Sequence, residues 1–115
     1  MIFNSAIPSQ GGGGTSGWTD ISSSFDADSA GYNIYAYTNG EMVFLTYVDE
    51  AGGATAIYVL TSAYNPIVDA FGAGVDTSGR PCTLQIDSEG NGTYYSTDSD
   101  PIMYASITYP IAPTQ

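Results

Sequence analysis

The strongest local constraint in this sequence is the dipeptide Asn39-Gly40, which separates two segments rich in aromatic and β-branched residues. The first segment covers residues 32–38, and the second covers residues 41–49. Asn-Gly between two such segments is typical of a two-residue β-hairpin turn of type I′, in which both central residues adopt a positive φ. The sequence therefore predicts a long antiparallel hairpin centred on this dipeptide.

The second arm of the hairpin carries apolar side chains on both of its faces. Successive side chains of a strand point to opposite sides, and here the two sides hold Val43, Leu45 and Tyr47 and, opposite them, Met42, Phe44 and Val48. A strand that is apolar on both faces is typical of one that is covered on both. We expect the cover to come from a second sheet and a loop, or from a neighbouring subunit.

From Gly17 onward the chain consists of short strand-like segments separated by turns, and no apolar pattern of helical period is present. The expected strands cover residues 17–21, 32–38, 41–49, 55–60, 70–75, 81–87, 93–96 and 102–109. Short strands at spacings of about eight to twelve residues are typical of antiparallel sandwiches. We predict an all-β fold, an antiparallel β-sandwich of about eight strands with a jelly-roll-like arrangement.

The first 16 residues differ from the rest in composition. They begin with a short, mildly apolar segment containing Ile2, Phe3 and Ile7, which is followed by the four consecutive glycines 11–14. A run of glycines has no conformational preference and acts as a flexible linker. We predict a flexible N-terminal segment, 1–16, and one β-domain, 17–115. The apolar start is either a loose terminus or a peptide anchor that docks into a larger assembly.

The charge balance excludes whole classes of partner. Arg80 is the only basic side chain beside twelve carboxylates, which gives a formal net charge of -11. Affinity for nucleic acid comes largely from Lys and Arg side chains that displace counterions from phosphates, and an acidic surface repels phosphate and anionic lipid alike. We therefore predict no nucleic-acid partner and no membrane insertion.

The chain contains no histidine, which removes the serine triad, the usual catalytic zinc sites and histidine general bases together. Cys82, the single cysteine, has no histidine to activate it and is predicted to pack as a small hydrophobic side chain. A carboxylate pair of the glycosidase type is the remaining option, and no pair is favoured over the others. We predict a protein that is not an enzyme and that uses no cofactor.

Residues 87–98 partly match a calcium-binding loop, with oxygen-bearing side chains at positions 1, 3, 5 and 12 and a glycine at position 6. However, Glu89 occupies a position that normally holds Asp or Asn, Asp98 replaces the usual glutamate, and no helices are expected on either side. A hairpin turn is the favoured interpretation. We predict no metal site.

The chain has ten tyrosines, and the loops around several of them are dense in Asp, Asn, Ser and Gly. Tyrosine offers a flat apolar face and a hydroxyl, which suit sugars and protein surfaces alike, although it also simply fits half-buried strands. Two loop regions, 64–69 and 89–95, are candidates for a ligand site, and the sequence does not decide whether they lie at the same end of the fold. The candidate residues are Tyr64, Asn65, Asp69, Glu89, Asn91, Tyr94 and Tyr95.

Four segments together, 17–21, 32–49, 60–66 and 84–92, resemble the head domains of bacteriophage fibre and receptor-binding proteins. In that family a strand ends in Leu-Pro, then Tyr and Pro stand two residues apart, and a later strand turns at a glycine-containing loop. This chain has Leu60, Tyr64 and Pro66 in those places and departs from the pattern at Thr61, where the family usually has proline.

The resemblance implies a homotrimer at the tip of a virion fibre or baseplate, made in the host cytoplasm, which binds the host surface, with a glycan as the favoured receptor and a protein as the alternative. It also implies that Ile2, Phe3 and Ile7 anchor the chain to other virion proteins. Three other functions compete with this one: a capsid or tail decoration protein, a non-catalytic carbohydrate-binding module, and a jelly-roll hydrolase.

Overall fold

The structure is a computed structural model, and it describes residues 17–29, 31–49, 54–96 and 100–112. The predicted flexible segment 1–16, with its anchor residues Ile2, Phe3 and Ile7, lies outside the described residues. Asp98 of the calcium-loop pattern lies outside them as well.

The described residues form an all-β fold, which confirms the predicted class. The nine strands are β1 (Thr19–Asp20), β2 (Phe25–Ala27), β3 (Asn33–Thr38), β4 (Met42–Val48), β5 (Ala56–Val59), β6 (Ala70–Asp76), β7 (Pro81–Ile86), β8 (Asn91–Tyr95) and β9 (Ile102–Pro110). Two single turns of 3₁₀ helix, η1 (Ser22–Ser24) and η2 (Ser62–Tyr64), interrupt the connections. β2 lies between the expected strands 17–21 and 32–38, in a stretch rich in Ser and Asp where no strand is expected from the sequence.

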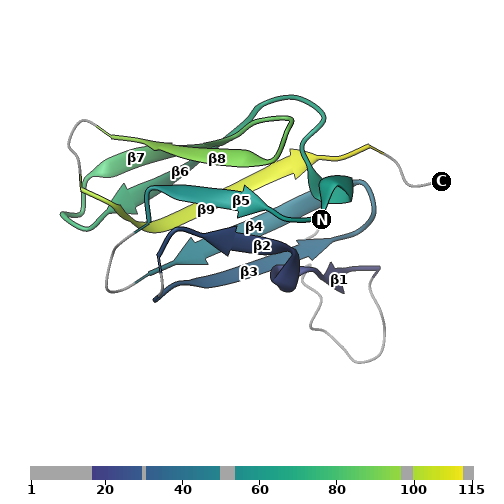
Figure 1. The fold of residues 1–115 in the computed structure, drawn as a ribbon, viewed down its shortest axis with the longest axis horizontal. Helices are drawn as coiled ribbons and strands as arrows, with labels where there is room; N and C mark the ends of the chain where they lie inside the picture. The colour runs from purple at the N-terminus through teal and green to yellow at the C-terminus, as the bar shows by residue number, and fades with distance from the viewer. Residues whose placement is uncertain (1–16, 30, 50–53, 97–99, 113–115) are drawn as a thin grey trace.

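All nine strands pair antiparallel in one continuous sheet, in the order β1-β3-β4-β9-β6-β7-β8-β5-β2. The predicted two separate sheets are therefore replaced by a single one that curls back over itself. Figure 1 shows the result: β5 and β2, at one end of the order, pass in front of β9, β4 and β3. The segment around η1 connects the two edges of the sheet, because β1 pairs with β3 and β2 pairs with β5.

Gly72 and Gly74 allow the sheet to bend sharply between β6 and β9. A side chain at Gly74 would place its Cβ 2.8 Å from the Ala105 Cα and still closer to the Tyr104 carbonyl oxygen. A side chain at Gly72 would lie 2.9 Å from the Ile107 Cα, against the Ser106 carbonyl. Only residues without a Cβ permit such a close approach of two backbones. Glycines inside a strand often mark a bulge, and the register shifts just beyond these two, between Val75 and Asp76.

The core lies on the concave side of the curled sheet, and alternating strand residues supply it. Cys82, Leu84 and Ile86 of β7 are buried, as their spacing predicts. The largest fully buried side chains include Tyr47 of β4 and Tyr109 of β9.

β4 alternates in burial, although both of its faces are apolar. Val43, Leu45 and Tyr47 are buried, whereas the opposite face, with Phe44 and Val48, is only half-buried. Neither a second sheet nor a loop among the described residues buries that outer face. Cover by a neighbouring subunit remains a prediction.

The predicted hairpin is present, with β3 and β4 paired from Asn33↔Val48 to Thr38↔Val43. Its predicted type I′ turn is wrong, because Gly40 has a φ of 93° but Asn39 does not have a positive φ. Asn39 acts through its side chain instead, since its Oδ1 accepts hydrogen bonds from the backbone N–H of Glu41 and of Met42, both at 2.9 Å. The Gly40 N–H donates to the Thr38 Oγ1 at 3.0 Å. Side-chain acceptors of this kind replace the backbone bonds of a tighter turn.

We expect Gly74→Ala to lower the free energy of unfolding by about 1–3 kcal/mol or more, because the new methyl group overlaps the β9 backbone. Chemical denaturation of the full chain measures this. The neighbouring Ala73→Val is the control, because Ala73 is exposed and Val suits a strand. Equal stabilities for Gly74→Ala and the wild-type chain would contradict the close approach of β6 and β9.

We expect Asn39→Ala to lower the free energy of unfolding by about 1 kcal/mol, because two backbone donors lose their acceptor. Asn39→Asp keeps the acceptor oxygen and should retain most of the stability. The midpoints of urea unfolding compare the two variants. A loss of the same size in both would show that the amide group itself, and not its oxygen, holds the turn.

Candidate functional site

Two loops that are distant in sequence meet at one end of the sheet, on the right in Figure 1. We name residues 60–69 and 87–91 together the loop end. The Ser88 N–H donates to the Asp69 Oδ1 at 3.2 Å, and the Asn65 side chain lies against Gly90. The structure thus brings together the two candidate regions whose relative position the sequence leaves open.

The first loop, residues 60–69, is held in place by hydrogen bonds to β9 and by a bridge to the residue that follows it. The hydroxyl of Tyr109, which is fully buried, donates to the Tyr64 carbonyl at 2.9 Å, and burial raises the pKa of Tyr109. The Ile67 N–H donates to the Pro110 carbonyl at 3.1 Å, and Pro66 forms a bridge with Ile111. A loop with this many fixed backbone groups presents its exposed side chains with little left to order on binding.

The second loop is a hairpin turn, which is the interpretation that the sequence favours over a calcium-binding loop. The Asp87 Oδ1 accepts hydrogen bonds from the backbone N–H of Glu89 at 2.9 Å and of Asn91 at 3.0 Å. Gly90 has a φ of 89°, and a Cβ there would lie 2.5 Å from the Asn65 Oδ1. Glycine is therefore required at position 90 by the backbone conformation and by the neighbouring loop together.

The exposed side chains of the loop end are aliphatic and acidic. Leu60, Ile67 and Val68 are 60%, 52% and 63% exposed. The exposed carboxylates of Asp69 and Glu89 belong to the same two loops. Large aliphatic side chains that are exposed on neighbouring loops make these loops a candidate interaction surface. The sequence analysis missed these three residues, although three large apolar side chains within ten residues around a proline were a usable signal.

The seven candidate residues divide into two groups. Tyr64, Asn65, Asp69, Glu89 and Asn91 lie at the loop end, and Tyr94 and Tyr95 lie at the end of β8. A chain of hydrogen bonds connects the two groups: the Tyr95 hydroxyl donates to the Gln85 Oε1 at 3.0 Å, and the Gln85 Nε2 donates to the Asp69 Oδ2 at 3.2 Å.

Tyr64 and Tyr94 are only partly buried but pack against the core. Tyr95 is 51% exposed on the outer side of β8. A tyrosine ring packed on the core has one face fewer to offer a ligand. Of the three tyrosines predicted to bind, Tyr95 is therefore the one whose ring is most available.

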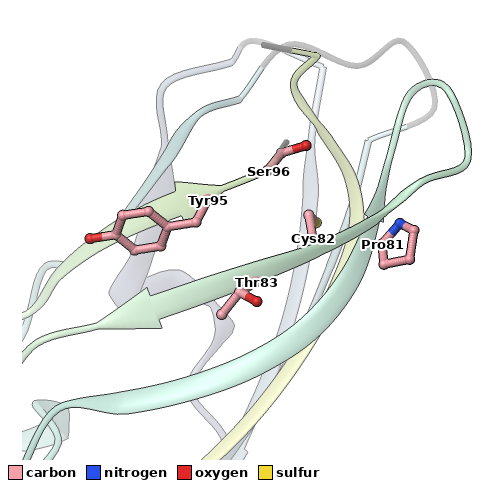
Figure 2. Close-up of a pocket in the computed structure, with 5 residues that line it drawn as sticks. All are labelled: Pro81, Cys82, Thr83, Tyr95 and Ser96. Carbon is pink, nitrogen blue, oxygen red and sulfur yellow. The ribbon is translucent and has the colours of Figure 1, made fainter. Parts of the chain in front are cut away.

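A shallow, open depression of about 280 Å³ lies away from the loop end, where β7 and β8 separate. It is lined by Pro81, Cys82, Thr83, Tyr95 and Ser96. Figure 2 shows these side chains spread along the two strands, without converging on one point. Burial, followed by the negative charge of Asp76, raises the pKa of the Cys82 thiol, which favours its protonated form.

Two buried carboxylates accept hydrogen bonds at the end of the sheet opposite the loop end. Asp76 accepts hydrogen bonds from the N–H groups of Arg80 and Ser78, both at 2.9 Å, and from the Ser96 hydroxyl at 3.2 Å. These hydrogen bonds lower the pKa of Asp76, and the bond from the Arg80 N–H has the largest effect.

Asp49 is the second buried carboxylate, and it accepts from the Tyr47 hydroxyl at 2.8 Å and the Ser29 hydroxyl at 2.6 Å. Burial, followed by the hydrogen bond to Asp49, raises the pKa of Tyr47. Both carboxylates are thus bound to donors of the protein itself. Within the described ranges, no group of three or more Asp, Glu, His or Cys side chains stands close enough to hold a metal ion.

No protein-family model, curated protein or solved structure matches this chain. In the described part of the chain, no helix has the length and apolar character needed to cross a membrane.

We expect acid to destabilise the fold partly through Asp76. Its pKa is lower in the folded chain than its ordinary value, so its contribution to stability is present above about pH 4 and is lost as the pH falls through the folded pKa. Asp76→Asn should therefore lower the melting temperature near neutral pH, and the difference from the wild-type chain should shrink below about pH 4.

Thermal unfolding between neutral and acidic pH measures this difference. Glu41→Gln is the control, because it also removes one negative charge but from an exposed side chain. A constant difference between Asp76→Asn and the wild-type chain across the pH range would contradict the lowered pKa.

Proposed function

We propose that this chain is a non-catalytic binding domain of a bacteriophage fibre or baseplate, and that it contacts the host surface through the loop end. The observation that carries the proposal is the meeting of residues 60–69 and 87–91, two loops fixed to each other and to the core by hydrogen bonds from Ser88 and Tyr109. Binding residues are commonly found on loops that a rigid scaffold positions. The family resemblance of four sequence segments adds the phage assignment.

The side chains of the loop end favour a protein partner. Leu60, Ile67 and Val68 supply exposed apolar area, whereas the Tyr64 ring packs against the core. Sugars are usually held by exposed aromatic rings, and protein surfaces accept aliphatic contacts with polar groups around them. Asp69 and Glu89 add negative charge, so a partner that is neutral or basic at this place is favoured over an acidic one.

The proposal also covers the assembly. Three copies in one particle multiply a weak single contact by avidity, and a homotrimeric head is what the resemblance implies. The N-terminal residues Ile2, Phe3 and Ile7 would then attach the head to other virion proteins, with the glycines at 11–14 as the linker between them.

A decoration protein of the capsid or tail is the second candidate. An aliphatic surface beside carboxylates fits a permanent virion partner as well as a host protein. The two candidates differ in the particle that the loop end recognises.

Adsorption of the labelled full chain to intact bacterial cells tests the proposal. We expect Val68→Glu to reduce adsorption by at least about tenfold, because a charge replaces an exposed apolar contact. Thr77→Glu is the matched control: it adds the same charge to an exposed β-branched residue beyond the other end of β6, and it should leave adsorption unchanged.

Pretreatment of the cells identifies the receptor class. Loss of adsorption after protease treatment supports a protein receptor. Loss of adsorption after periodate oxidation would show that the receptor is a glycan instead. If the chain adsorbs to no bacterial cell but binds capsids or tails through residues 17–112, the decoration function replaces the proposed one.

A further inference from the structure

The carboxylates of this chain are distributed unevenly over the fold. Among the carboxylates in the described ranges, only Asp20, Asp26 and Asp76 lie in strands, and the others lie in turns, loops and connections. β3, β4 and β9, three adjacent strands of the sheet, contain no charged residue on either face. β5, β7 and β8 contain no charged residue either, so in a chain with a net charge of -11 most of the sheet is uncharged. Among these strands β4 is the one with apolar side chains on both faces, and β3 and β9 are its neighbours in the sheet.

The outer face of these three strands, which we name the β3–β4–β9 face, is lined by aromatic, aliphatic and hydroxyl side chains. The strand registers set them in three rows: Asn33, Val48 and Tyr104; Tyr35, Thr46 and Ser106; Tyr37, Phe44 and Thr108. Tyr35 is 51% exposed and Tyr104 is 43% exposed, while Phe44, Thr46 and Val48 are half-buried. Large exposed side chains on a regular, uncharged sheet face indicate a surface that another molecule covers.

We propose that the β3–β4–β9 face is where this chain binds another copy of itself. A basic partner would be attracted by carboxylates, and this face has none. A second copy carries the same negative charge at its turns and loops, so two copies repel each other least where their uncharged faces meet. Sheets pack face to face through apolar and aromatic side chains of the kind that line these rows.

The inference deepens the proposed homo-oligomer and rests on it, and it is independent of what the loop end binds. It assigns the subunit contact to the outer face of the sheet, and it explains why β4 is apolar on both faces. One face of β4 belongs to the core of its own chain. The other face would be buried against a neighbour.

Self-association through this face has a characteristic dependence on salt. The attraction is apolar, and the opposing force is repulsion between the carboxylates of the two copies. Salt screens that repulsion, because the Debye length falls from about 30 Å at about 0.01 M to about 3 Å at about 1 M. Association should therefore strengthen as salt is added. Binding to a basic partner would show the opposite dependence.

Sedimentation velocity of the full chain at micromolar concentrations, at low and at high salt, tests the inference. Thr46→Glu places a carboxylate in the middle of the β3–β4–β9 face. Thr83→Glu is a closely matched control, because Thr83 lies in the same row of the sheet, on β7, and points to the same outer side. Thr108→Glu, at an exposed position of β9, is a second variant within the face. Circular dichroism and thermal unfolding show whether each variant is folded.

We expect the wild-type chain and Thr83→Glu to form oligomers that are more stable at high salt. Thr46→Glu and Thr108→Glu should weaken association by at least about tenfold, since each brings like charges together across the contact. A monomer at every concentration and salt would overturn the inference, as would equal weakening by Thr83→Glu or association that weakens with salt. Val68 lies outside the β3–β4–β9 face, so Val68→Glu should leave sedimentation unchanged while it reduces adsorption. Failure of the subunit contact can therefore be told apart from failure of the host-binding function.

Discussion

The close approach of β6 and β9 is the constraint on which the rest of the structure depends. Where Gly72 and Gly74 stand, no Cβ separates the two backbones, and the sheet can turn sharply between its central strands. Gly92 has the same function between β8 and β5, because a Cβ there would lie 2.7 Å from the Ile57 carbonyl oxygen. These glycines allow a single sheet to enclose a core that would otherwise require a second sheet.

The curl also determines what the ends of the sheet can do. It brings the connection after β5 beside the turn between β7 and β8, so that residues separated by about twenty positions share one surface. At the opposite end it encloses Asp49 and Asp76, which are satisfied by hydroxyl and backbone donors. A buried carboxylate is tolerated only where such donors surround it. In a chain with a single basic side chain, hydrogen bonds of this kind provide much of the order that ion pairs provide elsewhere.

The sequence predicts the local elements well and their assembly less well. The β3–β4 hairpin and the burial of Cys82, Leu84 and Ile86 follow from alternation and turn residues, which act over a few positions. The continuous sheet does not follow from them, because strand order depends on pairings between distant segments that no local pattern encodes. β2 was missed since three residues are too few for a periodic signal. At the loop end, composition identifies the polar candidate residues, but the contact between their two loops depends on the curl of the sheet. The exposed Ile67 and Val68 are not identified, because apolar residues are normally expected in the core.

The turn at Asn39-Gly40 also bears on how long the protein remains chemically intact. Asn-Gly is the sequence most susceptible to deamidation, in which the glycine nitrogen attacks the side-chain carbonyl of asparagine and ammonia is released. Here both reacting groups are engaged: the Gly40 N–H donates to the Thr38 Oγ1, and the Asn39 Oδ1 accepts from two backbone N–H groups. The attack requires the side chain to leave these donors and rotate towards the nitrogen. The hydrogen bonds of the turn therefore oppose deamidation at Asn39-Gly40, one of the two Asn-Gly dipeptides in this sequence.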